Sequence, residues 1–89
     1  MNQIKPDRSG WTVNSDGSIS YRNRIAARAR AHREAKALGH MLGSFTGLGT
    51  GRNFYATCGH CHGVVRNEIL TSRLYAPAGF FERPCATFF

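Results

Sequence analysis

The stretch TCGHCHG at residues 57–63 constrains the fold of this chain more than any other part of the sequence. It places two residues between Cys58 and Cys61, so both thiolates can bind one tetrahedral metal ion. Gly59 and Gly63 supply the backbone freedom of the tight turn, whose N–H groups can hydrogen-bond to the sulfurs. One such pair provides half of a metal site, so two further ligands must come from elsewhere in the chain.

The chain is short and has few large apolar side chains with which to build a core. Of its 89 residues, 18 are Leu, Ile, Val or Phe. One domain is expected, because two would each be too small to hold a core. A domain with so few large apolar residues usually needs a metal ion, disulfides or a partner to be stable. The composition therefore favours a small module with such a cross-link and excludes a large enzyme with a deep pocket.

The cysteines and histidines of the chain limit which residues can supply the two remaining ligands. Cys85 is the third and last cysteine, and the fourth ligand must be one of the four histidines, His32, His40, His60 or His62. His60 lies between the two cysteines and would be strained as a ligand. His40 follows the end of a predicted helix and can turn toward the cysteine pair. The expected ligands of one structural Zn²⁺ ion are His40, Cys58, Cys61 and Cys85, with His62 as the alternative histidine.

Three other interpretations use the same cysteines. Residues 58–62 match the C-x-x-C-H pattern of covalent haem attachment, but that chemistry takes place after export, and residues 1–8 show no apolar export signal. A redox-active pair would start a helix, whereas glycines flank this one. Unliganded thiols in a core are the third interpretation. An odd number of cysteines in a chain expected to be cytoplasmic argues against a disulfide framework.

The N-terminal part predicts a β-hairpin after a short lead-in. Residues 1–10 are polar and predict a flexible lead-in, with a single domain over residues 11–89. Within residues 11–21, apolar and polar side chains alternate on both sides of a predicted three-residue loop at residues 15–17. This loop would place Val13 opposite Ile19 and Trp11 opposite Tyr21, with all four side chains on one face. Gly17 would take the left-handed conformation in the loop.

Residues 21–38 predict a helix, because they are rich in Ala, Arg, Glu and Lys and contain no Gly or Pro. Ser20 is the predicted N-cap and Gly39 the predicted terminator. At 100° per residue, one side of this helix holds the small or apolar residues Ala27, Ala31, Ala35 and Leu38. The other side holds Arg30, Arg33 and Lys36, which we expect to remain in water or to meet a ligand.

The basic charge of the chain is concentrated in the same segment. The net charge is +7, and half of the 12 Lys and Arg residues are Arg22, Arg24, Arg28, Arg30, Arg33 and Lys36. Such a cluster suits DNA or RNA, and we expect these six side chains to contact it. A solvated helix face that keeps a small protein soluble is the alternative. A second functional hypothesis is docking on another protein through the aromatic pairs Phe80-Phe81 and Phe88-Phe89, which can also cap the core.

Residues 40–89 predict short strands joined by glycine-rich turns. The predicted strands are Phe54–Thr57, Val64–Arg66, Glu68–Leu70 and Ala78–Phe81, and residues 46–51 are predicted to be a flexible loop. The fold class expected for the whole chain is α+β: a hairpin, one basic helix and a zinc-ribbon-like sheet.

Catalysis and membrane insertion find little support in the sequence. The glycines at residues 47–51 lack the Lys-Ser/Thr signature of a phosphate-binding loop. The five acidic residues stand at no recognisable spacing from the cysteine pair, so a general base for a catalytic metal is not indicated. No segment approaches the roughly 20 apolar residues of a membrane span. We expect neither an enzyme nor a binder of small-molecule substrates or membranes.

The combination GHMLGSF at residues 39–45, ATCGHC at residues 56–61 and Pro-Cys at residues 84–85 resembles a group of small zinc-ribbon-like proteins of bacteriophages of mycobacteria and their relatives. The resemblance covers residues 31–86 and implies zinc ligands at His40, Cys58, Cys61 and Cys85. That group usually has Gly directly after the second cysteine, whereas here His62 intervenes, which keeps His62 open as a ligand. The resemblance implies a phage accessory protein in the host cytoplasm and carries no established activity.

Overall fold

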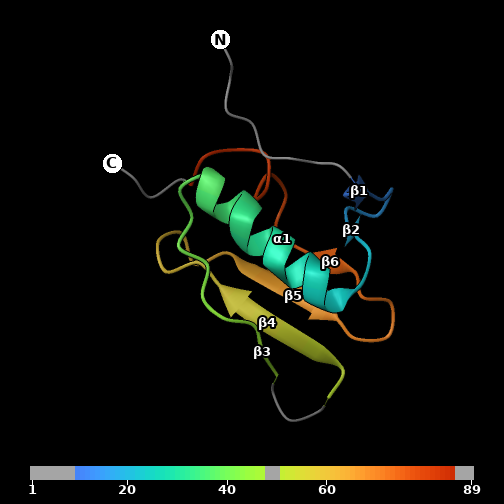
Figure 1. Ribbon diagram of the computed structural model, residues 1–89. Coiled ribbons are helices and arrows are strands. Elements are labelled where there is room, and N and C mark those ends of the chain that lie inside the picture. Colours follow the sequence, from blue (N-terminus) through green and yellow to red (C-terminus); the bar gives the residue numbers. More distant parts are fainter. Residues whose placement is uncertain (1–9, 48–50, 86–89) are drawn as a thin grey trace.

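The structure is a computed structural model that describes residues 10–47 and 51–85. In this part of the chain, one helix lies along one face of a six-stranded antiparallel sheet with the order β1-β2-β6-β5-β4-β3 (Figure 1). The elements are β1 (Thr12–Val13), β2 (Ile19–Ser20), α1 (Arg24–Ala37), β3 (Thr46–Gly47), β4 (Asn53–Thr57), β5 (Val64–Glu68) and β6 (Leu74–Tyr75). The expected α+β class is confirmed. The predicted lead-in falls outside the described residues, except for Gly10.

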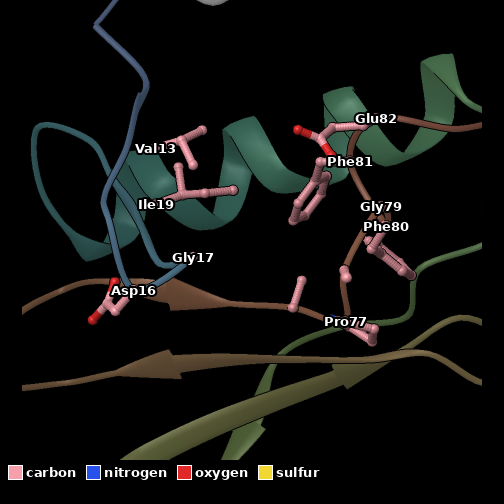
Figure 2. Close-up of a pocket in the computed structure, with 11 residues that line it drawn as sticks. Val13, Asp16, Gly17, Ile19, Pro77, Gly79, Phe80, Phe81 and Glu82 are labelled. Atoms are coloured by element: carbon pink, nitrogen blue, oxygen red, sulfur yellow. The ribbon is translucent and has the colours of Figure 1, made fainter.

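The N-terminal hairpin has the predicted loop and register. Val13 pairs with Ile19, the Asn14 N–H donates to the Ser18 carbonyl at 2.7 Å, and Gly17 has a φ of 87°. The register is consistent with the prediction that the four apolar side chains share one face, although Val13 is 53% exposed while Ile19 is buried. Val13 belongs to β1, at the edge of the sheet, and together with Ile19 it lines a cavity of about 420 Å³ between the hairpin and residues 76–82 (Figure 2).

The helix is shorter at its start than predicted and ends as predicted. Its N-cap is Asn23, whose side chain accepts a hydrogen bond from the Ala26 N–H at 2.9 Å, and not Ser20. Ser20 is held in β2, so the chain needs further residues to turn from the sheet into the helix. At the other end, Gly39 adopts a φ of 81° and the His40 N–H donates to the Ala35 carbonyl, which closes a Schellman motif.

The core lies between α1 and the inner face of the sheet. Ala27, Ala31 and Ala35 are fully buried, as predicted, and their small side chains let the helix approach the strands closely. Val65 and Leu74 are fully buried apolar residues of the sheet that belong to the same core cluster.

A polar contact also fastens the helix to the sheet. The Asn67 carboxamide, fully buried, accepts a hydrogen bond from Arg28 Nε at 2.7 Å and donates to the carbonyls of Ser72 and Arg73 at 3.1 Å each. The Arg28 guanidinium also lies over the Phe54 ring, 4.1 Å from its centroid. Arg28 is therefore partly buried and works as a helix-to-sheet link, which sequence periodicity alone does not indicate.

Several strand predictions after residue 40 need correction. Glu68 is the last residue of β5, and residues 69–70 form a turn. The predicted loop at residues 46–51 begins with β3, which pairs with β4, and residues 48–50 lie outside the described part. Strand β6 was not predicted, because Leu74-Tyr75 is too short a run to stand out in the sequence.

Residues 78–81 form turns, and their aromatic side chains close the core. Phe80 and Phe81 are 6% and 4% exposed, and Phe81 packs edge-on against Trp11 with ring centroids 5.6 Å apart. Figure 2 shows Phe81 below the helix, at the side of the cavity. Phe80 and Phe81 therefore cap the core, as the alternative predicted, and the expectation that they are exposed is wrong, whereas docking on a partner stays a prediction. Phe88 and Phe89 lie outside the described residues.

Arg30 is buried, which contradicts the expectation that it remains in water. Its Nε lies 3.1 Å from Glu34 Oε2, and both side chains are 1% exposed. Its guanidinium also lies 5.3 Å from the ring centroids of both Trp11 and Tyr21. Arg30 lies next to the alanine side of the helix, which faces the core. Its buried charge is compensated by the Glu34 carboxylate one turn later and by the two aromatic rings.

This burial gives a first prediction. Arg30→Met is expected to lower the free energy of unfolding by about 3–5 kcal/mol, because it removes a buried cation that lies against the buried Glu34 carboxylate. Replacing both residues with apolar ones, Arg30→Met with Glu34→Leu, should restore most of that loss. Arg33→Met is the matched control on the exposed side and should change stability by less than about 0.5 kcal/mol. Urea unfolding of the four proteins measures this, and equal stability of Arg30→Met and Arg33→Met would contradict the buried pair.

Candidate metal centre

His40, Cys58, Cys61 and Cys85 come together in space although they are far apart in the chain. Their ligand atoms all lie within 4.8 Å of one another, and three of the four residues are buried. His40 follows the end of α1, Cys58 follows β4, Cys61 lies on the next turn, and Cys85 belongs to the C-terminal segment. The cluster therefore joins three parts of the fold, and it can hold a metal ion.

The imidazole of His40 is oriented for metal binding by its surroundings. Its backbone is fixed by the Schellman motif that ends α1. Its Nε2 lies 2.8 Å from the Phe80 carbonyl, which accepts only if Nε2 carries the proton. In the neutral ring Nδ1 is then unprotonated, and it faces Cys61 Sγ at 3.6 Å. The ring also stacks on Phe80, with centroids 3.9 Å apart and planes 11° apart. Such a backbone partner fixes the tautomer that a metal ligand requires.

The turn from Cys58 to Cys61 surrounds one sulfur with backbone N–H groups. Cys58 Sγ accepts from the N–H groups of Met41, His60 and Cys61 at 3.4, 3.3 and 3.4 Å. Burial alone would raise the pKa of Cys58, but these donors outweigh burial and lower its pKa to about 5. The geometry thus favours the thiolate, which is the form that binds metal.

The pKa of Cys61, the second cysteine of the pair, shifts in the opposite direction. Burial and the nearby sulfurs of Cys58 and Cys85 raise the pKa of Cys61 above its ordinary value. Several thiolates this close together repel one another, and a divalent cation between them would remove that repulsion.

Backbone pairing brings the ligand-bearing segments side by side. The segment after α1 runs antiparallel to the end of β4, with a bridge between Leu42 and Cys58 and a hydrogen bond from the Gly59 N–H to the Met41 carbonyl at 2.8 Å. On the other side, the Cys85 N–H donates to the Leu38 carbonyl at 2.8 Å. This contact satisfies a carbonyl at the helix end and fixes the last ligand next to His40.

Gly63 is required by the packing beside the cluster. A Cβ atom at this position would lie 2.9 Å from two ring carbons of Phe80, and Phe80 in turn holds the His40 ring. Gly63 was predicted to give the turn its flexibility. It also leaves room for the Phe80 ring, which stacks on His40.

Two of the six distances between ligand atoms match the edges of a tetrahedral zinc site, and all six are within 4.8 Å. Cys58 Sγ and Cys85 Sγ are 3.9 Å apart, and Cys61 Sγ and His40 Nδ1 are 3.6 Å apart. Tetrahedral zinc with bonds of about 2.3 Å to sulfur and about 2.05 Å to nitrogen requires edges of about 3.8 and 3.6 Å. A disulfide requires about 2.05 Å between the sulfurs, so these cysteines are free thiols or thiolates.

The other histidines stand outside the cluster. His62, the alternative ligand, is exposed and adopts a left-handed φ of 63°, and its N–H closes the turn by donating to the Cys58 carbonyl. His32 has both ring nitrogens within 3.0 Å of backbone carbonyls, those of Arg28 and Gly43. Among the described residues, the candidate metal cluster contains His40 and neither of these two.

The six basic residues predicted to contact nucleic acid do not form one surface. Arg22, Arg24, Arg33 and Lys36 are exposed, as expected. Arg28 is partly buried against the sheet and Arg30 is inside the core, so neither is free to reach a phosphate from its present position. Arg30 differs from the four exposed residues because it contacts Trp11 and Tyr21, and Arg28 differs because it bonds to Asn67. These contacts appear only in the three-dimensional structure.

Solvent reaches the cluster from one side. His40 and Cys61 line a cavity of about 230 Å³ together with Phe80, Arg83 and Pro84. This opening provides a path by which an ion could enter the otherwise buried site.

Comparisons with models of known families, with curated proteins and with solved structures found no match for this chain. The resemblance to phage zinc-ribbon-like proteins therefore stays a prediction. In the part of the chain that the structure describes, no helix is long and apolar enough to cross a membrane.

Proposed function

We propose that the Cys₃His cluster holds one Zn²⁺ ion with a structural role, and that the chain is a small zinc-stabilised module that binds nucleic acid. The observation that carries the zinc proposal is the set of four candidate ligands, three of them buried, whose ligand atoms all lie within 4.8 Å of one another. Three soft thiolates with one imidazole suit zinc.

Four protein ligands fill the coordination of a structural zinc ion, whereas a catalytic zinc keeps one position for water. The ion would supply a cross-link between the end of α1, the turn after β4 and the C-terminal segment. For a chain with such a lean core, that cross-link replaces the stability that apolar burial supplies in larger domains.

Surface charge supports nucleic acid as the partner. The exposed cations of the described residues are Arg22, Arg24, Arg33, Lys36, Arg52 and Arg83, whereas the exposed carboxylates are Asp16 and Glu82. With a net charge of +7, this surface attracts a polyanion at long range. Docking on an acidic host protein is the competing proposal, and burial of Phe80 and Phe81 removes the aromatic surface that favoured it.

A salt titration tests the role of α1. If Arg22, Arg24, Arg33 and Lys36 each neutralise a phosphate, the plot of log K against log salt for duplex DNA should have a slope of about −3.6. The double variant Arg33→Glu with Lys36→Glu should bind more weakly and reduce the slope to about −1.8. Fluorescence anisotropy with a labelled duplex measures both quantities.

The matched control reverses the same number of charges elsewhere, with Arg52→Glu and Arg83→Glu. It should change the slope less than the helix variant does, because those residues lie outside α1. Equal slopes for the two double variants would show that only net charge matters. A dissociation constant above about 100 μM for the parent at physiological salt would contradict nucleic-acid binding altogether.

A further inference from the structure

The sheet has a second face, opposite α1, that carries an aromatic and basic row. Along β5, Val65 and Asn67 are buried under the helix, so the alternate residues Val64, Arg66 and Glu68 point to the other face. The register places Tyr55 of β4 directly beside Arg66, and Arg66 directly beside Tyr75 of β6. Three neighbouring strands thus present Tyr55, Arg66 and Tyr75 in line.

This row is partly exposed and its centre is held in place. Tyr55, Arg66 and Tyr75 are all intermediate in exposure. The Arg66 guanidinium lies over the Tyr75 ring, 4.1 Å from its centroid, and its Nη1 donates to Asn53 Oδ1 at 3.1 Å. The one helix of the described residues lies on the opposite face, as Figure 1 shows.

We propose that this row, the Tyr55–Arg66–Tyr75 row, is a stacking platform for single-stranded nucleic acid. The proposal rests on the proposed function and names its ligand class and a site for it, separate from α1. Aromatic rings and guanidinium planes stack on any unpaired base, and open sheet faces that carry aromatic residues bind single strands in this way.

The dimensions and charge of the row suit this ligand. Neighbouring strands are about 4.8 Å apart, so Tyr55 and Tyr75 stand about 10 Å apart with a cation between them. One base can stack on the Tyr55 ring, and another on the Arg66 guanidinium that lies over the Tyr75 ring. Glu68 is the one carboxylate on β5, at the end of the strand, where it accepts a hydrogen bond from Thr71 Oγ1 at 3.0 Å. A duplex hides its base faces inside the stack, so the platform should prefer single strands.

Binding of the zinc-loaded protein to a labelled oligothymidine and to a labelled duplex tests the platform. Tyr55→Val and Tyr75→Val keep a β-branched residue in the strand but remove the ring, and each should weaken oligothymidine binding by about 5- to 150-fold. Tyr55→Phe and Tyr75→Phe keep the ring and should bind within about twofold of the parent. Arg66→Lys keeps the charge, loses the planar stack and should also weaken binding. None of these changes should alter duplex binding.

The possible results separate the two proposals. Loss of oligothymidine binding in the Val variants with unchanged duplex binding supports the platform. Unchanged oligothymidine binding in both Val variants overturns it and leaves the row as a cross-strand contact of the sheet. If the parent binds neither oligonucleotide, the proposed function itself fails. Should a Val variant unfold, photo-crosslinking of the parent to oligothymidine decides: crosslinks at Tyr55 or Tyr75 support the platform, and crosslinks confined to α1 overturn it.

Discussion

Removing the metal from the purified protein with a chelator is expected to unfold it at room temperature. Structural zinc contributes about 10–16 kcal/mol of binding free energy in small zinc-dependent folds, which matches or exceeds the whole stability of a typical domain. Here the described core contains three fully buried alanines and few large apolar residues, so the metal-free chain has little else to hold it. The Cys85 segment and the end of α1 should separate first, because the cluster joins them.

Elemental analysis and circular dichroism check this prediction together. The purified protein should contain one zinc per chain, and chelation should abolish the cooperative thermal transition. Adding back Zn²⁺ should restore the transition, whereas adding Mg²⁺ should not, because Mg²⁺ prefers oxygen ligands. Metal-free protein that melts cooperatively at the temperature of the parent would refute a structural metal.

His40→Ala is expected to have nearly as large an effect, while a change at His62 should be almost silent. His40→Ala removes both a ligand and the ring that stacks on Phe80. Zinc affinity should fall by more than about 100-fold, since even the loss of a residue that merely orients a ligand costs 10- to 100-fold. His62→Asn is the matched control, because Asn removes the imidazole and tolerates the left-handed φ of 63° at that position.

Competition with a chromogenic zinc chelator measures the affinity of both variants, and thermal melts measure their stability. Cys85→Ser should resemble His40→Ala in both measurements. If His62→Asn loses zinc and His40→Ala retains it, the ligand assignment is wrong. If both variants retain zinc like the parent, the fourth ligand is neither histidine.

The parts of the fold that short-range rules control could be predicted from the sequence. The hairpin loop at residues 15–17, the helix end at Gly39 and the contact of alanines with the sheet each depend on a few neighbouring residues. The cysteine pair with Cys85 and a histidine was also predictable as a metal set, because few such residues exist in the chain. The structure favours His40 over His62 because a Schellman motif and the Phe80 carbonyl hold its ring in the cluster.

The parts that depend on distant contacts could not be predicted. Arg30 has the same side chain as Arg33, and only the positions of Trp11, Tyr21 and Glu34 bury it. The N-cap of the helix is Asn23 and not the predicted Ser20, because Ser20 pairs with Thr12 in the sheet. Strand β6 exists because its two residues find partners in β5 and β2. In each case a decisive partner lies on another element of the fold, which the periodicity of a single segment does not reveal.

The hydrogen bond from Cys85 to Leu38 has a consequence for folding during synthesis. Of the four cluster residues, Cys85 is the last to leave the ribosome, and it pairs with a helix end that emerged long before it. Until Cys85 has emerged, only three of the four ligands are present to bind an ion. The Leu38 carbonyl at the helix end also lacks its hydrogen bond from the Cys85 N–H. Metal capture and the final docking of the helix should therefore coincide, and only after Cys85 has emerged. The nascent chain would remain open to proteases until that moment.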